Sequence, residues 1–229
     1  MAQTASAPER AIKIAVDGGQ VSGLLVEPEK PRACYVLAHG AGVGMQHVFM
    51  ATVAMGLAQR RIATVRYNFP YMEQKRRRPD SPKLAQAAVR AAVGEAARSL
   101  RDIPLFAGGK SYGGRMTSQA QAEEPLERVR GLIFLGFPLH APGQPSSERA
   151  EHLSSVKVPM LFLQGTRDEF AEGDYLKPLI KRLGGRATLK PFESADHSFH
   201  VAAKTGRTDV EVMEELLDTT VSWIDGVTG

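Results

Sequence analysis

The sequence has 229 residues, of which 43% are hydrophobic and 24% are charged. This is enough apolar material for one core, so we expect a single domain over residues 1–229 with a flexible segment at 1–10. Cys34 is the only cysteine, which excludes internal disulfides and cysteine-based zinc sites. The chain has no run of 18 apolar residues and no secretory signal pattern, so we expect a cytoplasmic protein without a membrane partner.

The basic residues are unevenly distributed. The formal net charge is +4, from 29 Lys and Arg against 25 Asp and Glu, and residues 75–78 (KRRR) carry +4 by themselves. A nucleic-acid binder usually spreads its basic residues over a face or a helix, whereas one short run is typical of a solvated loop. We therefore do not expect nucleic acid as a partner, and the run stays a candidate for attracting anionic substrates.

Strands and helices alternate along the first half of the chain. The predicted strands in this half cover residues 11–16, 21–27, 33–37 and 62–67. The first two form a hairpin around an Asp-Gly-Gly turn, and the third is continuously apolar, which is typical of a strand buried on both faces. Helices are expected over residues 47–60 and 82–101; in the second, Pro82 after Ser81 is a favourable start.

The same alternation continues to the end of the chain. The predicted strands in this half cover residues 105–108, 131–135, 160–164 and 187–192. The predicted helices between them cover residues 113–124, 147–153 and 175–183. A last helix follows Thr208, because Thr208 and Glu211 have the spacing of a capping box.

This order of elements predicts the fold class. Alternating strands and helices after an opening hairpin indicate an α/β fold, with a mostly parallel sheet of seven to eight strands and helices on both faces. Ligands of such sheets bind at the carboxyl ends of the strands. Only residues 136–159 separate two late strands where a lid is commonly inserted, so we expect no cap domain and an open site.

A serine lies where a nucleophile would be expected. Residues 109–113 (GKSYG) fit G-x-S-x-G, and they follow a predicted strand and precede a predicted helix. This is the setting of a nucleophile elbow, whose flanking glycines leave room for a strained central residue. A glycine-rich turn with an incidental serine is the alternative. The pattern favours Ser111 as a nucleophile once a base and an acid are found.

Two later loops supply that base and acid. A serine hydroxyl needs a histidine held by a carboxylate, and in this fold the chain order is Ser, acid, His. His197 follows the strand at 187–192 and is preferred over His200. Asp168 follows the strand at 160–164, with Glu169 as its near competitor. Each is weak evidence alone, but their order after successive strands predicts a triad of Ser111, Asp168 and His197.

Acyl transfer also needs N–H donors for a developing oxyanion. Tyr112, directly after Ser111, supplies one, and the H-G-x-G pattern at residues 39–42 indicates Ala41 for the other. Side chains near strand ends are candidates for the substrate pocket, with local loop packing as an equal alternative. These candidates are Gly42, Met45, Phe69, Tyr71, Leu139 and His140.

Taken together, these residues resemble a known family. The chain is similar to small α/β-hydrolases of the dienelactone-hydrolase-like type, and most of all to bacterial relatives of the testis-expressed and chromatin-complex hydrolase-like proteins. The matching segments are 39–42 (HGAG), 66–71 (RYNFPY), 109–115 (GKSYGGR), 137–140 (FPLH), 165–168 (GTRD) and 195–198 (ADHS). The resemblance implies the same triad. Dienelactone hydrolases proper have a cysteine at the elbow, so the dienelactone substrate is not implied.

The sequence thus predicts a serine hydrolase that cleaves carboxylic esters of small or extended acyl groups through an acyl-serine intermediate. A small-molecule ester is the expected partner, and the chemistry needs no cofactor and no metal. A thioesterase, amidase or acyltransferase would use the same residues. A protein-interaction module on a hydrolase scaffold is the alternative from a different class.

Overall fold

The computed structural model describes residues 7–144 and 146–229 and is built on an eight-stranded sheet. The strands, β1 to β8, are Glu9–Val16, Gly19–Val26, Ala33–Ala38, Ile62–Tyr67, Leu105–Lys110, Val129–Leu135, Met160–Gly165 and Ala187–Phe192. Their order across the sheet is β1-β2-β4-β3-β5-β6-β7-β8. The pairs that β2 makes with β1 and β4 are antiparallel, and all pairs from β4 to β8 are parallel. The mostly parallel sheet is confirmed.

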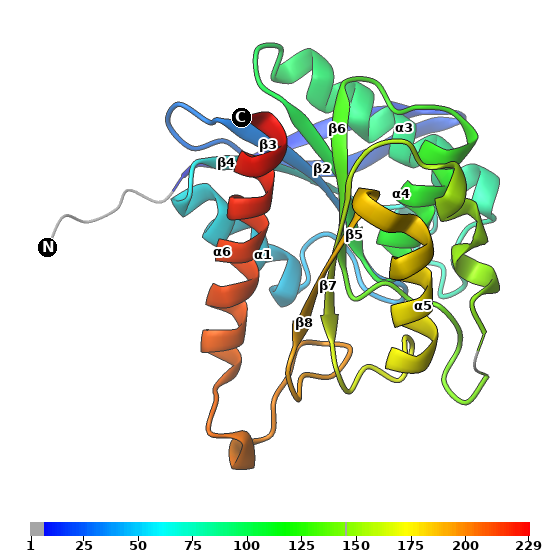
Figure 1. Ribbon diagram of the computed structural model, residues 1–229. Helices are drawn as coiled ribbons and strands as arrows, with labels where there is room; N and C mark the ends of the chain where they lie inside the picture. The colour runs from blue at the N-terminus through cyan, green and yellow to red at the C-terminus, as the bar shows by residue number, and fades with distance from the viewer. Residues whose placement is uncertain (1–6, 145) are drawn as a thin grey trace, which may run out of the picture.

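Helices cover both faces of the sheet (Figure 1). One face carries α1 (Val48–Gln59) and α6 (Asp209–Thr228), and the other carries α3 (Pro82–Ser99), α4 (Tyr112–Glu123) and α5 (Gly173–Leu183). The short helices are α2 (Pro70–Glu73), η1 (Glu148–Ser155), η2 (Gly184–Arg186) and η3 (Ala203–Thr205). Among the described residues, none of these helices has both the length and the apolar character needed to cross a membrane.

The ends of the elements differ from the predicted ones in ways that have local causes. Strand β1 begins at Glu9 because it pairs with β2 along its whole length, so part of the segment expected to be flexible is a strand. Residues 1–6 lie outside the described residues. The helix α2 was not predicted, although Pro70 is at its first position, where proline is favoured. The capping box is confirmed, with Thr208 Oγ accepting from the Glu211 N–H at 3.2 Å.

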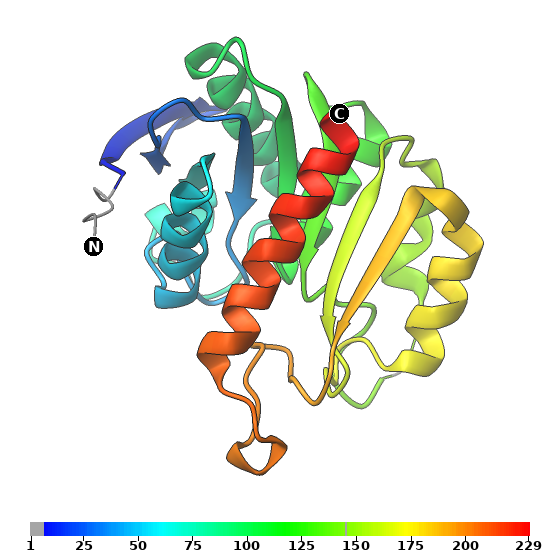
Figure 2. The ribbon, with the colours of Figure 1, turned by 60° about the vertical axis from the view of Figure 1, so that its left-hand side comes forward.

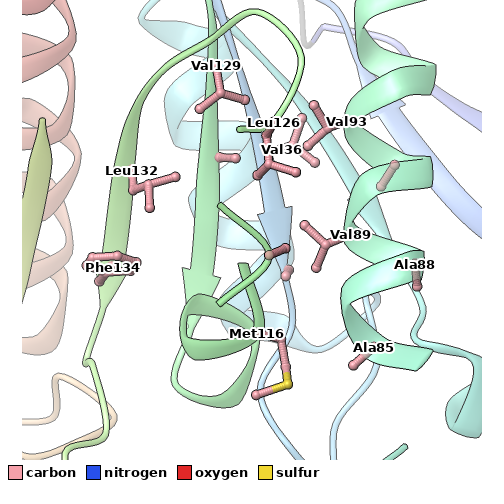
Figure 3. Packing of buried hydrophobic residues seen from close by; sticks show 14 of the residues in the cluster. Val36, Ala85, Ala88, Val89, Val93, Met116, Leu126, Val129, Leu132 and Phe134 are labelled. Atoms are coloured by element: carbon pink, nitrogen blue, oxygen red, sulfur yellow. The ribbon is translucent and has the colours of Figure 1, made fainter. Parts of the chain in front are cut away.

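Each face of the sheet has its own apolar core. Val89 and Val93 extend from α3 toward Val36 on β3, and Met116 of α4 lies in the same cluster (Figure 3). On the opposite face, α6 runs diagonally across the strands, and its side chains pack with those of α1 (Figure 2). Strand β3 is buried at every position, which explains its lack of polar and apolar alternation.

The carboxyl ends of the parallel strands are left open by the connection from β6 to β7. The described part of residues 136–159 holds only η1 as regular structure, and position 145 lies outside the described residues. The expected absence of an inserted cap domain between these strands therefore holds for the part of the connection that is described. Ser111, which follows β5, and His197, in the loop after β8, are both partly exposed at this edge of the sheet.

Two glycines allow α4 to begin almost in contact with β3. A Cβ atom at Gly109 would lie 2.2 Å from the Ala38 carbonyl oxygen. At Gly113 it would lie 2.6 Å from the carbonyl oxygens of both Ala38 and His39. These are backbone atoms that cannot rotate away, so the G-x-S-x-G pattern is a steric requirement of the strand-to-helix turn.

Replacement of Gly113 by alanine should lower the free energy of unfolding by about 1–3 kcal/mol, because α4 would have to move away from β3. Gly94→Ala is the matched control, since the same methyl group on α3 would meet only the end of the Arg98 side chain at 3.5 Å. The control should raise stability by about 0.5–1 kcal/mol through helix propensity. Urea unfolding of both variants measures these opposite changes in the free energy of unfolding. Changes of the same sign and size in the two variants would contradict the steric argument.

Candidate active site

Ser111 lies in a strained turn between β5 and α4. Its backbone angles are φ 49° and ψ −115°, a region that residues with a side chain rarely adopt. Its N–H donates to the Leu135 carbonyl of β6 at 3.2 Å, which helps to hold this conformation. A non-glycine residue persists at such angles only where its surroundings dictate them, and such residues cluster at functional sites.

Asp168 and His197 come from the loops after β7 and β8, and the structure joins their side chains. His197 Nδ1 lies 2.7 Å from Asp168 Oδ2. Asp168 is 3% exposed, and it also accepts hydrogen bonds from the Gln164 amide and from the Phe170 N–H. Because the Nδ1 proton is directed to the carboxylate, the Nε2 atom of His197 is left as the acceptor. His197 lines the same cavity as Ser111.

The competing residues have other partners. Glu169, next to Asp168, is exposed. His200 is paired with Asp209 at the start of α6, at 2.8 Å, and this hydrogen bond raises the pKa of His200. Asp196 accepts the His200 N–H at 3.0 Å and so shapes its own loop. The geometry therefore favours Asp168 and His197 over their neighbours.

Lys110 holds the loop that carries His197, a contact that the sequence did not predict. Its Nζ atom donates to the His197 carbonyl oxygen at 2.6 Å and lies about 6 Å from the ring centres of Phe49 and Phe199. Burial lowers the pKa of Lys110 to about 8, while the charge of Asp168 opposes this shift. The only sequence signal was its position directly before the serine, which brings it to the end of β5.

The loop after β3 is fastened to the segment after β4. In the His39 ring, Nδ1 donates to the Gly40 carbonyl at 2.8 Å and Nε2 accepts from the Phe69 N–H at 3.1 Å. The Gly42 N–H donates to the Tyr71 hydroxyl oxygen at 3.2 Å. Burial lowers the pKa of His39 to about 4. The ring is therefore neutral at pH 7, as its accepting nitrogen requires.

The two predicted oxyanion donors, Ala41 and Tyr112, line a cavity together with Ser111. Tyr112 is the first residue of α4, so its N–H has no acceptor within the helix. In the described part of the chain, neither N–H donates to another backbone carbonyl. Both groups are thus unoccupied donors beside the serine.

Met45, a predicted pocket residue, is not among the residues that line the cavities at Ser111. Its carbonyl accepts from Arg66 Nη1 and its N–H donates to Asn68 Oδ1, both at 2.9 Å, and the residue is 5% exposed. Arg66 is itself buried, and its guanidinium is paired with Glu9 of β1. The side chains of Arg66, on β4, and Asn68, directly after it, thus bind the backbone of Met45, which lies in the interior.

The other predicted pocket residues also lie elsewhere. Four of them are almost fully buried: Phe69, Tyr71, Leu139 and His140. Phe69 packs edge-to-face against His39, and the N–H groups of the two residues after Pro138 donate to the Phe170 carbonyl. Gly42 is exposed but lines neither cavity at Ser111. These residues support the loops instead of contacting the space beside the serine.

Residues 31–225 match the model of a family described as the alpha/beta hydrolase domain. The chain belongs to this α/β-hydrolase family. The finer likeness to the testis-expressed and chromatin-complex proteins stays a prediction.

Solved structures share the hydrolase fold along nearly the whole chain. A dienelactone hydrolase from Anabaena variabilis has a TM-score of 0.77 at 19% identity, with 97% of this chain and 99% of that chain covered. A serine hydrolase without a lid from Xanthomonas campestris has a TM-score of 0.74 at 20% identity, with 94% of each chain covered. An esterase from Pyrococcus furiosus has a TM-score of 0.73 at 13% identity, with 97% of this chain and 92% of that chain covered. At these identities the likeness shows the fold alone.

In this α/β-hydrolase, a cavity of about 820 Å³ adjoins Ser111 and His197. Its walls come from α1, from α6 and from the loop that carries the histidine. The apolar side chains in these walls are Val43, Val48, Phe49, Met50, Phe199, Val210 and Met213. These residues are far apart in the sequence, so no local pattern could have identified them as one wall.

A second cavity, of about 390 Å³, also reaches Ser111, from the side of α3, α4 and η1. The two cavities share Ala41, Ser111 and Phe170 and otherwise lie over opposite faces of the sheet. Among residues 7–144 and 146–229, no cluster of three or more His, Cys, Asp or Glu side chains is arranged to hold a metal ion.

The neutral, buried His39 predicts acid sensitivity. Its folded-state pKa of about 4 lies below the ordinary value of 6.5, so the unfolded chain binds the proton first and stability falls as the pH drops from about 7 to 4. His39 contributes at most about 3 kcal/mol to this loss. His152, whose pKa burial also lowers to about 4, acts in the same direction.

Chemical unfolding at pH 7 and at pH 4.5 measures this dependence of the free energy of unfolding on pH. His39→Gln should show a smaller loss between the two pH values than the wild type, whatever its stability at pH 7. An unchanged slope in the variant would mean that His39 is not the titrating group.

Proposed function

We propose that this α/β-hydrolase is a serine hydrolase that cleaves carboxylic esters through an acyl-serine intermediate. The observation that carries the proposal is the 2.7 Å hydrogen bond between His197 and the buried Asp168, beside a serine at positive φ. A scaffold without activity needs neither the strained serine nor the buried carboxylate. Their combination at an open cavity is the arrangement that nucleophilic catalysis requires.

The proposed reaction assigns one role to each group. Ser111 Oγ attacks the ester carbonyl carbon while His197 Nε2 takes its proton, and the carbonyl oxygen becomes an oxyanion between the N–H groups of Ala41 and Tyr112. Asp168 orients the imidazole and stabilises its cation. His197 then gives the proton to the departing alkoxide, which leaves as the alcohol. His197 next deprotonates a water molecule whose oxygen attacks the acyl carbon, and it returns this proton to Ser111 Oγ as the acid leaves.

The larger cavity supports small or extended acyl groups as substrates. Its apolar walls favour a hydrocarbon chain, and the described connection between β6 and β7 contains no lid that would enclose a long one. The names of the similar structures, a dienelactone hydrolase and an esterase, agree with ester cleavage. A thioester or amide bond would be attacked by the same groups, so the bond type is a matter for assay.

Fluorophosphonate labelling and hydrolysis of short p-nitrophenyl esters test the proposal. The wild type should label and turn over, whereas Ser111→Ala should do neither and His197→Ala should lose at least about a thousandfold in kcat. His200→Ala is the matched histidine control and should keep most of its activity, because its partner is Asp209.

A folded wild type that neither labels nor hydrolyses any ester would favour the interaction module. Full activity in Ser111→Ala would mean that another residue is the nucleophile. If His200→Ala lost its activity while His197→Ala kept it, His200 would be assigned as the general base instead of His197.

Lys110 should act as a positioning residue in this reaction. Lys110→Met removes the charged donor to the His197 carbonyl, and kcat should fall about 10- to 100-fold while KM changes less. Lys83→Met, an exposed lysine on α3, is the control and should behave as the wild type. A Lys110→Met enzyme with unchanged kcat, or with a raised KM alone, would assign the lysine to structure or to substrate binding instead.

A further inference from the structure

The smaller cavity beside Ser111 differs from the larger one in its charge. Three arginines from separate parts of the chain line it: Arg78 before α3, Arg115 on α4 and Arg149 on η1. Arg115 is one turn along the helix from the serine. The larger cavity is lined mainly by apolar side chains, and its two acidic residues, Asp209 and Glu214, lie on α6, so the arginines set the smaller cavity apart.

These positive charges lack a matching carboxylate. Asp80 is the single acid among the residues lining the cavity, and its two oxygens accept from Arg76 at 2.5 Å and from the Tyr71 N–H at 2.9 Å. Within the described residues, Arg78, Arg115 and Arg149 take part in no ion pair. Like charges gathered at one cavity repel one another, so the arrangement is unfavourable until an anion enters.

Arg115 gives the clearest sign of a missing partner. Its Nε–H is buried and meets no acceptor in the described residues, although buried donors in folded proteins are nearly always paired. Burial and the nearby charge of Arg149 both lower the pKa of Arg115, which nevertheless stays charged at neutral pH. A guanidinium presents parallel N–H groups that match the two oxygens of a carboxylate or phosphate.

We propose that this cavity is a subsite for an oxyanion group, a carboxylate or phosphate, carried by the substrate of Ser111. The inference rests on the proposed ester hydrolysis and narrows its substrate class. The substrate would be an ester with an acidic group on one side of the scissile bond and an apolar group on the other. The acidic group would accept hydrogen bonds from the Arg115 guanidinium and offset the repulsion between the arginines.

A matched set of esters tests this subsite. For an acid in the acyl part, mono-p-nitrophenyl glutarate is compared with p-nitrophenyl butyrate. For an acid in the leaving group, 4-carboxyphenyl butyrate is compared with its methyl ester. In the wild type, kcat/KM for one acid-bearing ester should exceed that of its neutral counterpart by about 10- to 100-fold, the contribution of one or two charged hydrogen bonds.

The ratio of the two kcat/KM values is the readout, since a general loss of activity cancels from it. The ratio should fall to about one in Arg115→Gln and in the double variant with Arg149→Gln. In Arg115→Lys the ratio should lie between this value and that of the wild type, because lysine keeps the charge but lacks the parallel N–H groups of a guanidinium. Arg77→Gln is the control, because Arg77 is exposed in the same basic run and does not line the cavity. If Arg115→Gln does not fold, Arg149→Gln alone carries the comparison.

Anion binding gives a second readout that does not depend on turnover. Inorganic phosphate and glutarate should each raise the melting temperature of the wild type and of Arg77→Gln, and neither should raise that of Arg115→Gln. A response to one anion alone would identify which oxyanion the site takes.

The two assays separate the two proposals. If no ester is hydrolysed but anions bind in an arginine-dependent way, the hydrolysis is refuted, and the cavity is an anion site but not a substrate subsite. Ester turnover without a charge preference, or with one that survives in folded Arg115→Gln and Arg149→Gln, would refute the subsite and leave the hydrolysis standing.

Discussion

The contact between the first turn of α4 and the end of β3 determines the geometry of the whole site. Gly113 lies against the carbonyl oxygens of Ala38 and His39, so the turn that strains Ser111 and the loop that carries Ala41 are held against each other. A nucleophile and an oxyanion donor must keep their spacing to within a fraction of an ångström for electrostatic stabilisation to work. Here that spacing is set by backbone packing, which rotamer changes do not alter.

Sequence patterns predicted the elements that depend on local chemistry. The buried strands and the capping box at Thr208 follow from patterns within a short segment, and Ser111, Asp168 and His197 were each predicted from their place just after a strand. The pocket could not be found in this way. Phe69 and Tyr71 follow a strand end, as pocket residues do, but an apolar ring there can equally turn inward, and only tertiary packing decides between the two. Val48 and Met213 line one cavity although they are 165 positions apart in the sequence, and no local pattern indicates this proximity.

The basic residues at 75–78 are adjacent in the sequence but have different environments in the structure. All three arginines are exposed, but Arg76 is paired with the buried Asp80, Arg78 lines the smaller cavity, and Arg77 does neither. Four adjacent charges thus have at least three different environments. The site as a whole is asymmetric across the sheet: the cavity toward α1 and α6 is mainly apolar, and the cavity toward α3 and α4 is lined by three arginines. A substrate with one apolar and one acidic end would have a single productive orientation in such a site.

Arg66 links the far edge of the sheet to the reaction centre. Its buried guanidinium joins Glu9 of the N-terminal strand to the Met45 carbonyl, just beyond the loop that contains Ala41. Removal of one partner from such a pair leaves an uncompensated charge in the interior, which costs several kcal/mol. Shortening the chain by even the first strand would therefore disturb a loop three strands away. The position of an affinity tag or a protease site near β1 therefore affects the conformation of the loop beside Ser111 as well as the yield of protein.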